Sequence, residues 1–498
     1  MYHFDRVAGY YAHDPHKSES YATAAAQLEY PDARRAALVK ALEAQNGPSP
    51  ELSKLAQPGT VAVVTGQQVG LFSGPAYTVF KAVTAAKVTA NLNQQGIPAV
   101  TIFWLASEDH DFPEVNHVDV FDADHRPVRL MVDLPKQFEG QTRPVGNVPV
   151  TAPPIEALRK TLHGLPHADE VMAAVEAAYR PGVTMTEGFR ALVKSILGKL
   201  GLIFLDPLDP AIRAIGAPFI AEALKNAPEL KASLLKRNHE LTSAGYHAQV
   251  HMEEKTSLFF LLENGQRVSL RKKDHEFAEL ADRAAEISPN ALLRPVLQDY
   301  LLPSVAYVGG PAELAYFAQS KVIYDRLLGR MPVMVARSCF TLIDSRASKL
   351  AKRYNLGLRD ITVADDLLKD RIAKTLIPES LEASLEKNTS AISRELDAMS
   401  REIGAFDPTL GAALAKSRAK ITHQVEKLRK KMTREALRRD QRAAAEAEYL
   451  GNLIYPHKHL QERLYSILPF LAKHGMDLPE QIFNDARLDC PDHRILSF

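Results

Sequence analysis

Cysteine is scarce in this chain of 498 residues, which contains only Cys339 and Cys490. Two widely separated cysteines cannot form a disulfide framework or a four-thiolate metal site. A reducing, cytoplasmic location is therefore expected. An excess of one charge is also absent, since 61 Lys and Arg residues balance 60 Asp and Glu residues. No overall field directs the chain to nucleic acid or to a membrane surface.

Long apolar runs are absent as well. No stretch of about 18 apolar residues occurs, so no membrane-spanning helix is expected. The first residues, MYHFDRVAGYYAHDPHKS, lack the apolar segment of a secretory signal. The hydrophobic share of 46% is ordinary for a soluble globular protein. The length suggests two or three domains.

The stretch 60–105 has the pattern of a strand–helix–strand unit. Residues 60–64, TVAVV, predict a buried strand, and TGQQVGLFSG predicts a polar loop. Pro75 suits the first turn of a helix that ends near Gly96, and PAVTIFWLA predicts the next strand. Such units have parallel strands. The loops after both strands should therefore lie at the same edge of the sheet, where ligands bind.

The same pattern recurs and predicts an α/β chain with a Rossmann-like parallel-sheet core over residues 1–377. Further strands are predicted in 199–210, 304–309 and 332–344. Excursions from the core are expected at about 122–185 and 217–300, the second with a hairpin at Asn264-Gly265. Residues 378–450 predict an antiparallel pair of amphipathic helices, a coiled-coil hairpin. Residues 451–498 are expected to pack back on the core.

A run of titratable residues, SEDHD, follows the strand that ends in FWLA. Glu108, Asp109, His110 and Asp111 would desolvate or repel one another, so stability alone does not explain them. Three interpretations stay open: acid–base chemistry with His110, a divalent metal with His110 or His117, or a structural loop.

The loop TGQQVGLFSGP is typical of a site where backbone N–H groups and a helix N-terminus approach an anion. It matches neither the Walker A nor the dinucleotide-binding glycine pattern. A tight turn is the alternative interpretation. Lys81 lies one helical turn after Tyr77, and a surface lysine is the alternative there.

The later segment LLRPVLQDYLLPSVAYVGGPAELAYF offers a second set of polar residues. Arg294 could bind a carboxylate through two hydrogen bonds. Gly309 and Gly310 suggest close approach of the backbone to a ligand. The alternative for each polar residue is a surface group without a role. Residues 416–442, in the second of the C-terminal helices, contain 11 Lys and Arg against 3 Asp and Glu and mark a basic arm. The arm is either a solvated face or an anion-binding surface.

The blocks TGQQVGLFSGPAYTVFKA, FWLASEDHDFPEVNH, LLRPVLQDYLLPSVAYVGGPAELAYF and PHKHLQERLYSILPFLAKHG closely resemble the cysteine ligase family of bacillithiol biosynthesis. They occur in family order from about residue 60 to 475. The resemblance implies a Rossmann core related to class I aminoacyl-tRNA synthetases, two insertions and a helical hairpin that dimerises. It also implies amide-bond formation between the carboxyl of cysteine and the amine of glucosaminyl-malate.

Two synthetase features are missing, because neither an H-x-G-H nor a K-M-S-K-S signature occurs. ATP, for carboxyl activation, is therefore expected only by analogy with the synthetase fold. No metal is predicted, since the two cysteines cannot supply a cysteine-selecting zinc site. The predicted partners are cysteine, glucosaminyl-malate, a nucleotide and a second copy of the chain. A non-catalytic sugar-malate or nucleotide binding protein is the alternative.

The predicted site takes residues from both the first and the second half of the core sequence. The candidate catalytic residues are Glu108, Asp109, His110 and Asp111, with His110 as the base that accepts the proton of the amine. The candidate substrate-binding residues are Thr65, Gly66, Gln67, Gln68, Gly74, Tyr77, Lys81, Asn116, His117, Arg294, Gln298, Gly309, Gly310 and Glu313.

Overall fold

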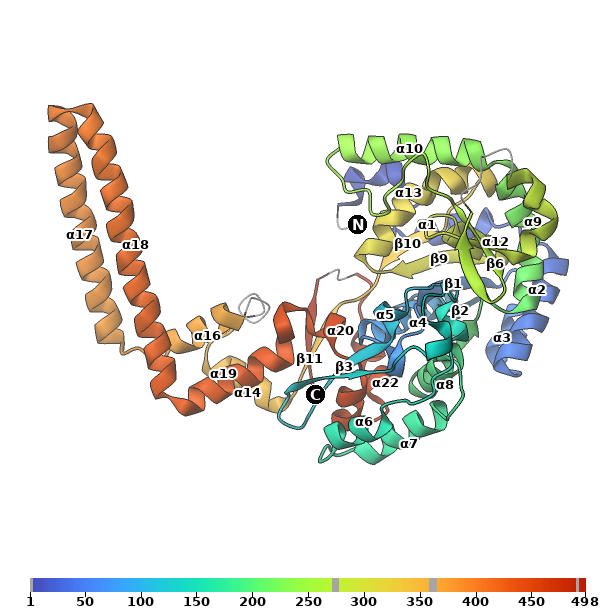
Figure 1. Cartoon of the computed structure of the whole chain (residues 1–498), viewed down its shortest axis with the longest axis horizontal. Helices are drawn as coiled ribbons and strands as arrows, with labels where there is room; N and C mark the ends of the chain where they lie inside the picture. Colours follow the sequence, from blue (N-terminus) through green and yellow to red (C-terminus); the bar gives the residue numbers. More distant parts are fainter. Residues whose placement is uncertain (1–2, 271–276, 358–364, 490–491) are drawn as a thin grey trace. The chain divides into compact units, whose positions relative to one another are not determined.

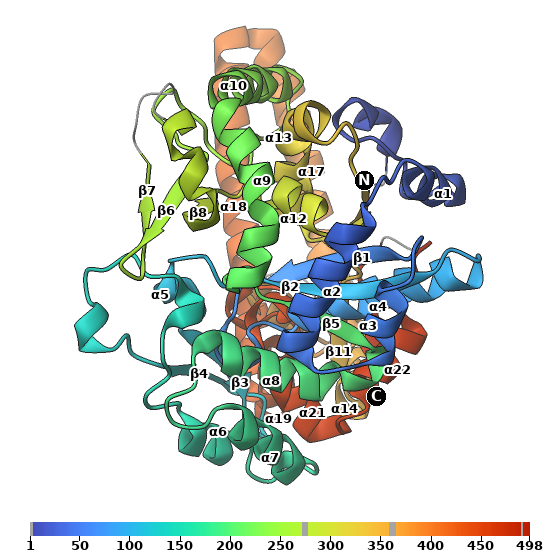
Figure 2. The same cartoon turned by 90° about the vertical axis from the view of Figure 1, so that its right-hand side faces the viewer.

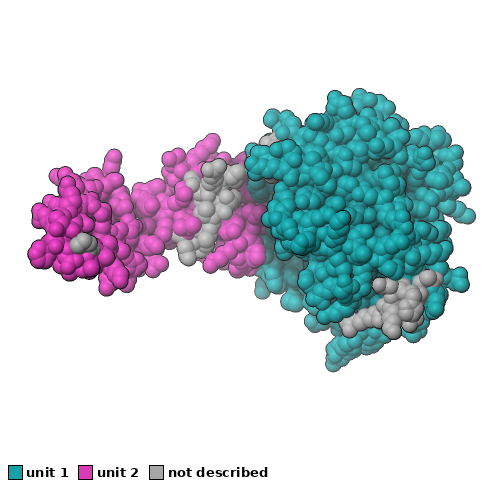
Figure 3. Space-filling view, turned by 90° about the horizontal axis from the view of Figure 1, so that it is seen from above, with its two compact units in different colours: residues 1–123, 128–340, 462–494 teal, residues 124–127, 341–461, 495–498 magenta. Residues whose placement is uncertain are grey.

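The computed structural model describes residues 3–270, 277–357, 365–489 and 492–498. The chain forms two compact units, coloured separately in Figure 3. The first comprises residues 1–123, 128–340 and 462–494, and the second comprises 124–127, 341–461 and 495–498. The division falls at 340, whereas the sequence suggested 377, because helix α16 (Asp365–Lys374) packs on the helices α18 and α19 of the second unit.

A five-stranded parallel sheet forms the centre of the first unit (Figure 1). Its strands lie in the order β10 (Val333–Ala336), β9 (Ser304–Gly309), β1 (Val61–Gln67), β2 (Ala99–Leu105) and β5 (Leu202–Leu205). Every pairing is parallel. The chain runs outward from β1 to β5 and then returns to the other side of β1, so the order reverses between β1 and β9. The predicted Rossmann-like core is confirmed, and its topological switch point is at β1 and β9.

Helices cover both faces of this sheet (Figure 2). On one face, α1 (Ser18–Ala26) and α4 (Tyr77–Gln94) bury alternate valines of β1, β9 and β10. On the other, α2 (Asp32–Asn46), α9 (Pro210–Lys225), α12 (Arg294–Leu301) and α13 (Pro311–Leu327) bury the intervening side chains. Strands that are buried on both faces read as continuous apolar runs, which is why the sequence revealed them.

Long connections carry the additional elements of the first unit. Between β2 and β5 lie α5 (Phe112–Val115), β3 (His117–Phe121), β4 (Pro127–Met131), α6 (Ile155–Leu162), α7 (Ala168–Ala178) and α8 (Met185–Leu197). Between β5 and β9 lie α9, α10 (Ala227–Ser243), β6 (Phe259–Glu263), β7 (Gln266–Ser269), β8 (Ile287–Pro289) and α12. Asn264 and Gly265 join β6 to antiparallel β7 with φ angles of 52° and 73°. The predicted hairpin is confirmed, because a type I′ turn needs positive φ at both positions.

Two sequence-based boundaries were wrong. The polar run Thr65–Gln67 continues β1 instead of starting a loop, because it pairs with Phe103–Leu105 of β2. The single strand predicted over 332–344 is two strands in different sheets, β10 and β11 (Phe340–Ile343). The break falls at Arg337, whose side chain turns to bind Glu462.

The second unit contains the predicted helical hairpin, built from α17 (Glu379–Phe406) and α18 (Pro408–Arg439). The two helices are antiparallel, and the ion pairs Arg418–Asp397 and Arg429–Glu382 link them. Asp407 alone separates them and caps α18, since its Oδ1 accepts from the Thr409 N–H at 2.7 Å. The chain continues through α19 (Gln441–Ile454).

The last helices of the chain rejoin the first unit. After α20 (Gln461–Leu464), α21 (Leu468–His474) packs on α7 and α22 (Leu478–Asp485) packs on α4. Within the ranges that the structure describes, no helix is both long and apolar enough to cross a membrane.

Candidate active site

A cavity of about 470 Å³ opens beside the carboxyl ends of β1, β2 and β9. Its size is typical of a small-molecule site, and its place is the switch point of the sheet, as the fold predicts. Charges of both signs line it, so a matching ligand carries both as well. The charged lining residues are Lys81, Arg267, Arg294, Arg337, Arg463, Glu108, Asp109, Glu114 and Glu313.

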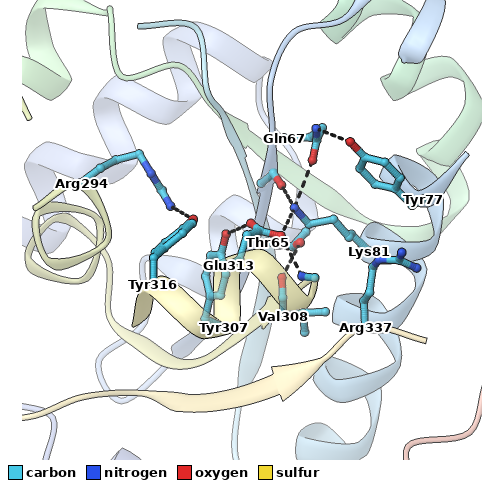
Figure 4. Close-up of polar contacts among 12 residues, drawn as sticks. Thr65, Gln67, Tyr77, Lys81, Arg294, Tyr307, Val308, Glu313, Tyr316 and Arg337 are labelled. Atoms are coloured by element: carbon cyan, nitrogen blue, oxygen red, sulfur yellow. Dashed lines mark hydrogen bonds and ion pairs between the residues drawn. The ribbon is translucent and has the colours of Figure 1, made fainter. Parts of the chain in front are cut away.

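Lys81 and Glu313 form an ion pair that spans the switch point (Figure 4). Lys81 comes from α4 and Glu313 from the first turn of α13, and Nζ lies 2.7 Å from Oε2. The ammonium also donates to the carbonyl of Gly66 and, at 3.2 Å, to Oε1 of Gln67. Lys81 is only 1% exposed, so the alternative of a surface lysine was wrong.

Glu313 has further donors besides Lys81. The Tyr307 hydroxyl donates to Oε1 at 2.6 Å, and the Gly310 N–H donates to Oε2 at 2.8 Å. Burial alone would raise the pKa of Glu313. The Lys81 ammonium and these hydrogen bonds outweigh that effect and hold the pKa below its usual value. The carboxylate therefore stays ionised in the cavity.

Arg294, from the start of α12, is held by two neighbouring side chains. Its guanidinium donates to the Tyr316 hydroxyl at 2.9 Å and to Oε1 of Gln298 at 3.1 Å. Burial acts to lower the pKa of Arg294, but Tyr316, Tyr307 and Glu313 act more strongly and raise it. A permanently charged guanidinium in this position can bind a carboxylate.

Glu108 is the most buried titratable residue of the SEDHD run, with 6% exposure. Its Oε1 accepts from Arg213 of α9 at 2.6 Å. Burial raises the pKa of Glu108 in spite of Arg213 and Arg267, which act to lower it. A carboxyl group with a raised pKa is better matched to proton transfer near neutral pH than an ordinary one.

Asp109 and Glu114 face the same cavity and are joined by Gln68. The side-chain amide of Gln68 donates to Oδ2 of Asp109 and to Oε2 of Glu114, each at 2.8 Å. One amide thus brings two carboxylates together at the end of β1 and β2. Two neighbouring carboxylates are a suitable binding place for an ammonium group.

His110 contacts an arginine that the β6–β7 hairpin supplies. Nη1 of Arg267 lies 3.0 Å from Nδ1 of His110. Because arginine only donates, Nδ1 is the acceptor, and the proton of the neutral ring is on Nε2. Arg267 also stacks on Phe260, 3.8 Å from the ring centroid, and donates to Oγ of Ser288. In this arrangement His110 presents an N–H donor, whereas the sequence argument made it the base.

The other predicted residues lie at differing distances from the cavity. Gly66, Gln67, Gln68, Tyr77 and Gly310 line it. Gln298 does not line the cavity but accepts a hydrogen bond from Arg294. Oγ1 of Thr65 donates to the Val308 carbonyl at 2.9 Å, which links β1 to β9. The predicted residues that remain do not line the cavity: Gly74, His110, Asp111, Asn116, His117 and Gly309.

Glycine at 309 has a packing reason: a Cβ there would meet the Tyr307 ring at 3.0 Å and Cβ of Glu313 at 3.1 Å. Gly74 has φ of +64°, which favours glycine. Asp111 is exposed at the start of α5. Nδ1 of His117 lies against the Pro113 carbonyl and Oδ1 of Asn116. Packing, backbone conformation and surface position account for these five residues without a ligand.

The lining residues that sequence reasoning missed include Tyr307, Glu114, Arg267, Arg337 and Arg463. Arg337 follows β10 directly, so the rule that ligands bind at strand ends could have found it. Tyr307 and Glu114 stand inside segments that the sequence had already marked. No local signal distinguishes Arg267 or Arg463 from other arginines.

The helix starts that border the cavity do not form a backbone cradle for the phosphates of ATP. At α13, the Gly310 N–H is engaged by the Glu313 side chain. At α4, the Ala76 N–H donates to the Tyr465 carbonyl at 2.7 Å. Phosphate binding at helix N-termini depends on such N–H groups. These helix starts do not fit the group.

Comparisons with known proteins cover the whole chain. The family model described as "Bacillithiol biosynthesis BshC, N-terminal Rossmann-like domain" matches residues 1–338, and that of the C-terminal coiled-coil domain matches 340–498. The "Putative cysteine ligase BshC" of Solibacter usitatus is 51% identical over 100% of this chain and 96% of its own length. Its namesake in Koribacter versatilis is 34% identical over 96% of this chain and 93% of its own length. The chain therefore belongs to the BshC family of bacillithiol biosynthesis, whose curated relatives are named as ligases.

Proposed function

We propose that this chain catalyses the last step of bacillithiol synthesis, the formation of an amide bond between the carboxyl of cysteine and the amine of glucosaminyl-malate. The names of its relatives support a cysteine ligase. The observation that carries the proposal is a cavity that offers Arg294 for a carboxylate and the neighbouring carboxylates of Asp109 and Glu114 for an ammonium. Both substrates carry an ammonium and at least one carboxylate.

Binding of the two substrates follows from these two groups. Arg294 would hold a carboxylate, with Tyr316 and Gln298 fixing the plane of its guanidinium. Asp109 and Glu114 would hold the ammonium of the sugar amine, since Gln68 keeps both carboxylates at one place. Holding the amine beside the cysteine carboxyl converts an encounter of two molecules into a reaction within one complex.

The amine must lose a proton before its nitrogen can attack the carboxyl carbon. Glu108 is the group that we assign to accept this proton, because it lines the cavity and burial raises its pKa. His110, whose Nδ1 is engaged by Arg267, does not line the cavity. This assignment therefore replaces His110 as the base.

Amide formation from a free carboxyl and an amine releases water and needs an energy source. Activation by ATP stays a prediction by analogy with the synthetase fold. Product analysis tests both points: the purified chain is incubated with cysteine and glucosaminyl-malate, with and without ATP, and the thiol products are identified by mass spectrometry. The proposal expects the cysteinyl amide of glucosaminyl-malate in at least one of the two reactions.

The alternative, a non-catalytic binding protein, gives a different result in the same experiment. Such a protein would be stabilised against heat by glucosaminyl-malate, because a ligand that binds only the folded state raises its stability, yet it would form no product. Ligand-dependent stabilisation without product in both reactions would refute the ligase assignment for this chain.

We also propose that the chain acts in the cytoplasm as a homodimer joined by α17 and α18. The hairpin leaves large apolar side chains in solvent, among them Met399 at 47%, Leu428 at 59% and Phe406 at 85% exposure. A row of exposed apolar residues on paired helices is typical of a helix-to-helix interface. A second hairpin is the occupant that the family resemblance favours.

A further inference from the structure

A group of three side chains lies next to the cavity but outside its lining. Sγ of Cys339, a carboxylate oxygen of Glu462 and a ring nitrogen of His493 all lie within 4.8 Å of one another. Cys339 stands between β10 and β11, Glu462 belongs to α20, and His493 precedes β12 (Arg494–Ser497). The backbone N–H of Arg494 donates to the Cys339 carbonyl at 3.0 Å, which brings the chain end beside the cysteine.

We propose that Cys339, Glu462 and His493 bind a divalent ion of the zinc class. Thiolate, imidazole and carboxylate are the ligands that zinc accepts, at about 2.0–2.3 Å. Tetrahedral coordination at these lengths separates ligand atoms by about 3.5 Å. The three ligand atoms lie within 4.8 Å of one another, so each pair needs to approach by little more than about 1 Å. Rotation of the side chains can supply this movement.

The surroundings of Glu462 support this assignment. Arg337 donates to both of its oxygens, at 2.6 and 2.9 Å, and the Phe340 N–H donates to Oε2 at 3.0 Å. Metal-binding carboxylates are commonly oriented by such outer hydrogen bonds. The carboxylate of Glu462, which is 1% exposed, is thus fixed in direction beside Cys339 and His493.

The protonation states of the other two residues are compatible with binding. Burial lowers the pKa of His493, although Glu462 opposes it, and this favours the neutral ring that can bind an ion. Burial raises the pKa of the Cys339 thiol to about 11. An ion would displace that proton, as metals do at thiol ligands. With one protein ligand fewer than a closed structural site, the ion would keep a fourth position for water.

The proposal goes beyond the ligase reaction and does not depend on it. The sequence argument excluded a metal because the two cysteines are far apart, but Glu462 and His493 supply ligands that spacing does not reveal.

The test uses Co²⁺ as a probe on the full chain, after removal of metal by a chelator and with a phosphine reductant present. Cobalt bound to a thiolate gives a near-ultraviolet charge-transfer band. The proposal expects this band to saturate at one equivalent, and Zn²⁺ to abolish it by competition. Cys339→Ser should lose the band, and His493→Gln should weaken Co²⁺ binding by at least about 10-fold.

Two control variants sharpen the result. Cys490→Ser removes the other cysteine, which lies outside the described residues, and should keep the band. His163→Gln removes an exposed histidine away from the group and should bind Co²⁺ like wild type. A wild-type chain without the band would mean that the three residues form a hydrogen-bonded group only. A band that persists in Cys339→Ser would overturn the site, as would unchanged affinity in His493→Gln.

Discussion

Replacing Lys81 with methionine tests the ion pair at the switch point. The substitution keeps most of the volume of the side chain but leaves the buried carboxylate of Glu313 without its ammonium partner. Breaking one side of a buried pair costs about 3–5 kcal/mol. Glu313 keeps the Tyr307 hydroxyl and the Gly310 N–H, and its side chain is 20% exposed. We therefore expect the lower end, about 3 kcal/mol of unfolding free energy.

A second substitution distinguishes the pair from simple loss of packing. In Lys81→Met/Glu313→Gln the buried charge is gone, and the amide can still accept from Tyr307. The double variant should therefore be more stable than Lys81→Met by at least about 1 kcal/mol, within the coupling energies seen for contacting residues. The two partners lie 2.7 Å apart in the wild type.

Urea unfolding followed by fluorescence is the assay, because the chain has one tryptophan and Trp104 is buried in the same unit. The pKa of Glu313 is lowered on folding, so the pair stabilises fully above about pH 4.3 and less as the pH falls through the folded-state pKa. The gap between wild type and Lys81→Met should shrink on acidification. A double variant that is less stable than Lys81→Met would refute the reasoning.

Three further predictions concern the reaction, the ligand and the dimer. Glu108→Gln should lower turnover about 10²–10⁴-fold, whereas the control Asp111→Asn, an exposed carboxylate of the same run, should stay near wild type; equal losses would remove Glu108 as the base. Trp104, which lines the cavity, should change its fluorescence when glucosaminyl-malate saturates the site, and an unchanged spectrum at calorimetric saturation would argue against binding there. Met399→Lys should give a monomer in light scattering. The control Met131→Lys, at a similarly exposed methionine outside the hairpin, should not. If both variants stay dimeric, the interface is refuted.

The sheet was predictable because its strands are buried on both faces, and continuous β-branched runs such as TVAVV reveal that environment without tertiary information. The end of β1 was not predictable, because Thr65–Gln67 are polar and only their pairing with β2 makes them a strand. Polarity alone predicted a loop there.

The site was predictable where its residues directly follow strands, as Glu108 and Asp109 do. Sequence adjacency did not aim the whole run inward, since Asp111 is exposed while Glu108 is buried. The partner that sets the tautomer of His110, Arg267, lies 157 residues away. A contact over such a separation depends on how the β6–β7 hairpin packs, and one sequence contains no local sign of it.

The lining of the cavity has a consequence for how the protein is made. Its walls draw on β1 near the beginning of the chain and on Arg463 near the end. A ribosome releases the chain from residue 1 onward, so the growing protein completes its sheet long before the last arginine emerges. Until then the pocket lacks one of its five cations. A message that stops after codon 336 and before codon 463 therefore encodes all five Rossmann strands but an unfinished substrate site.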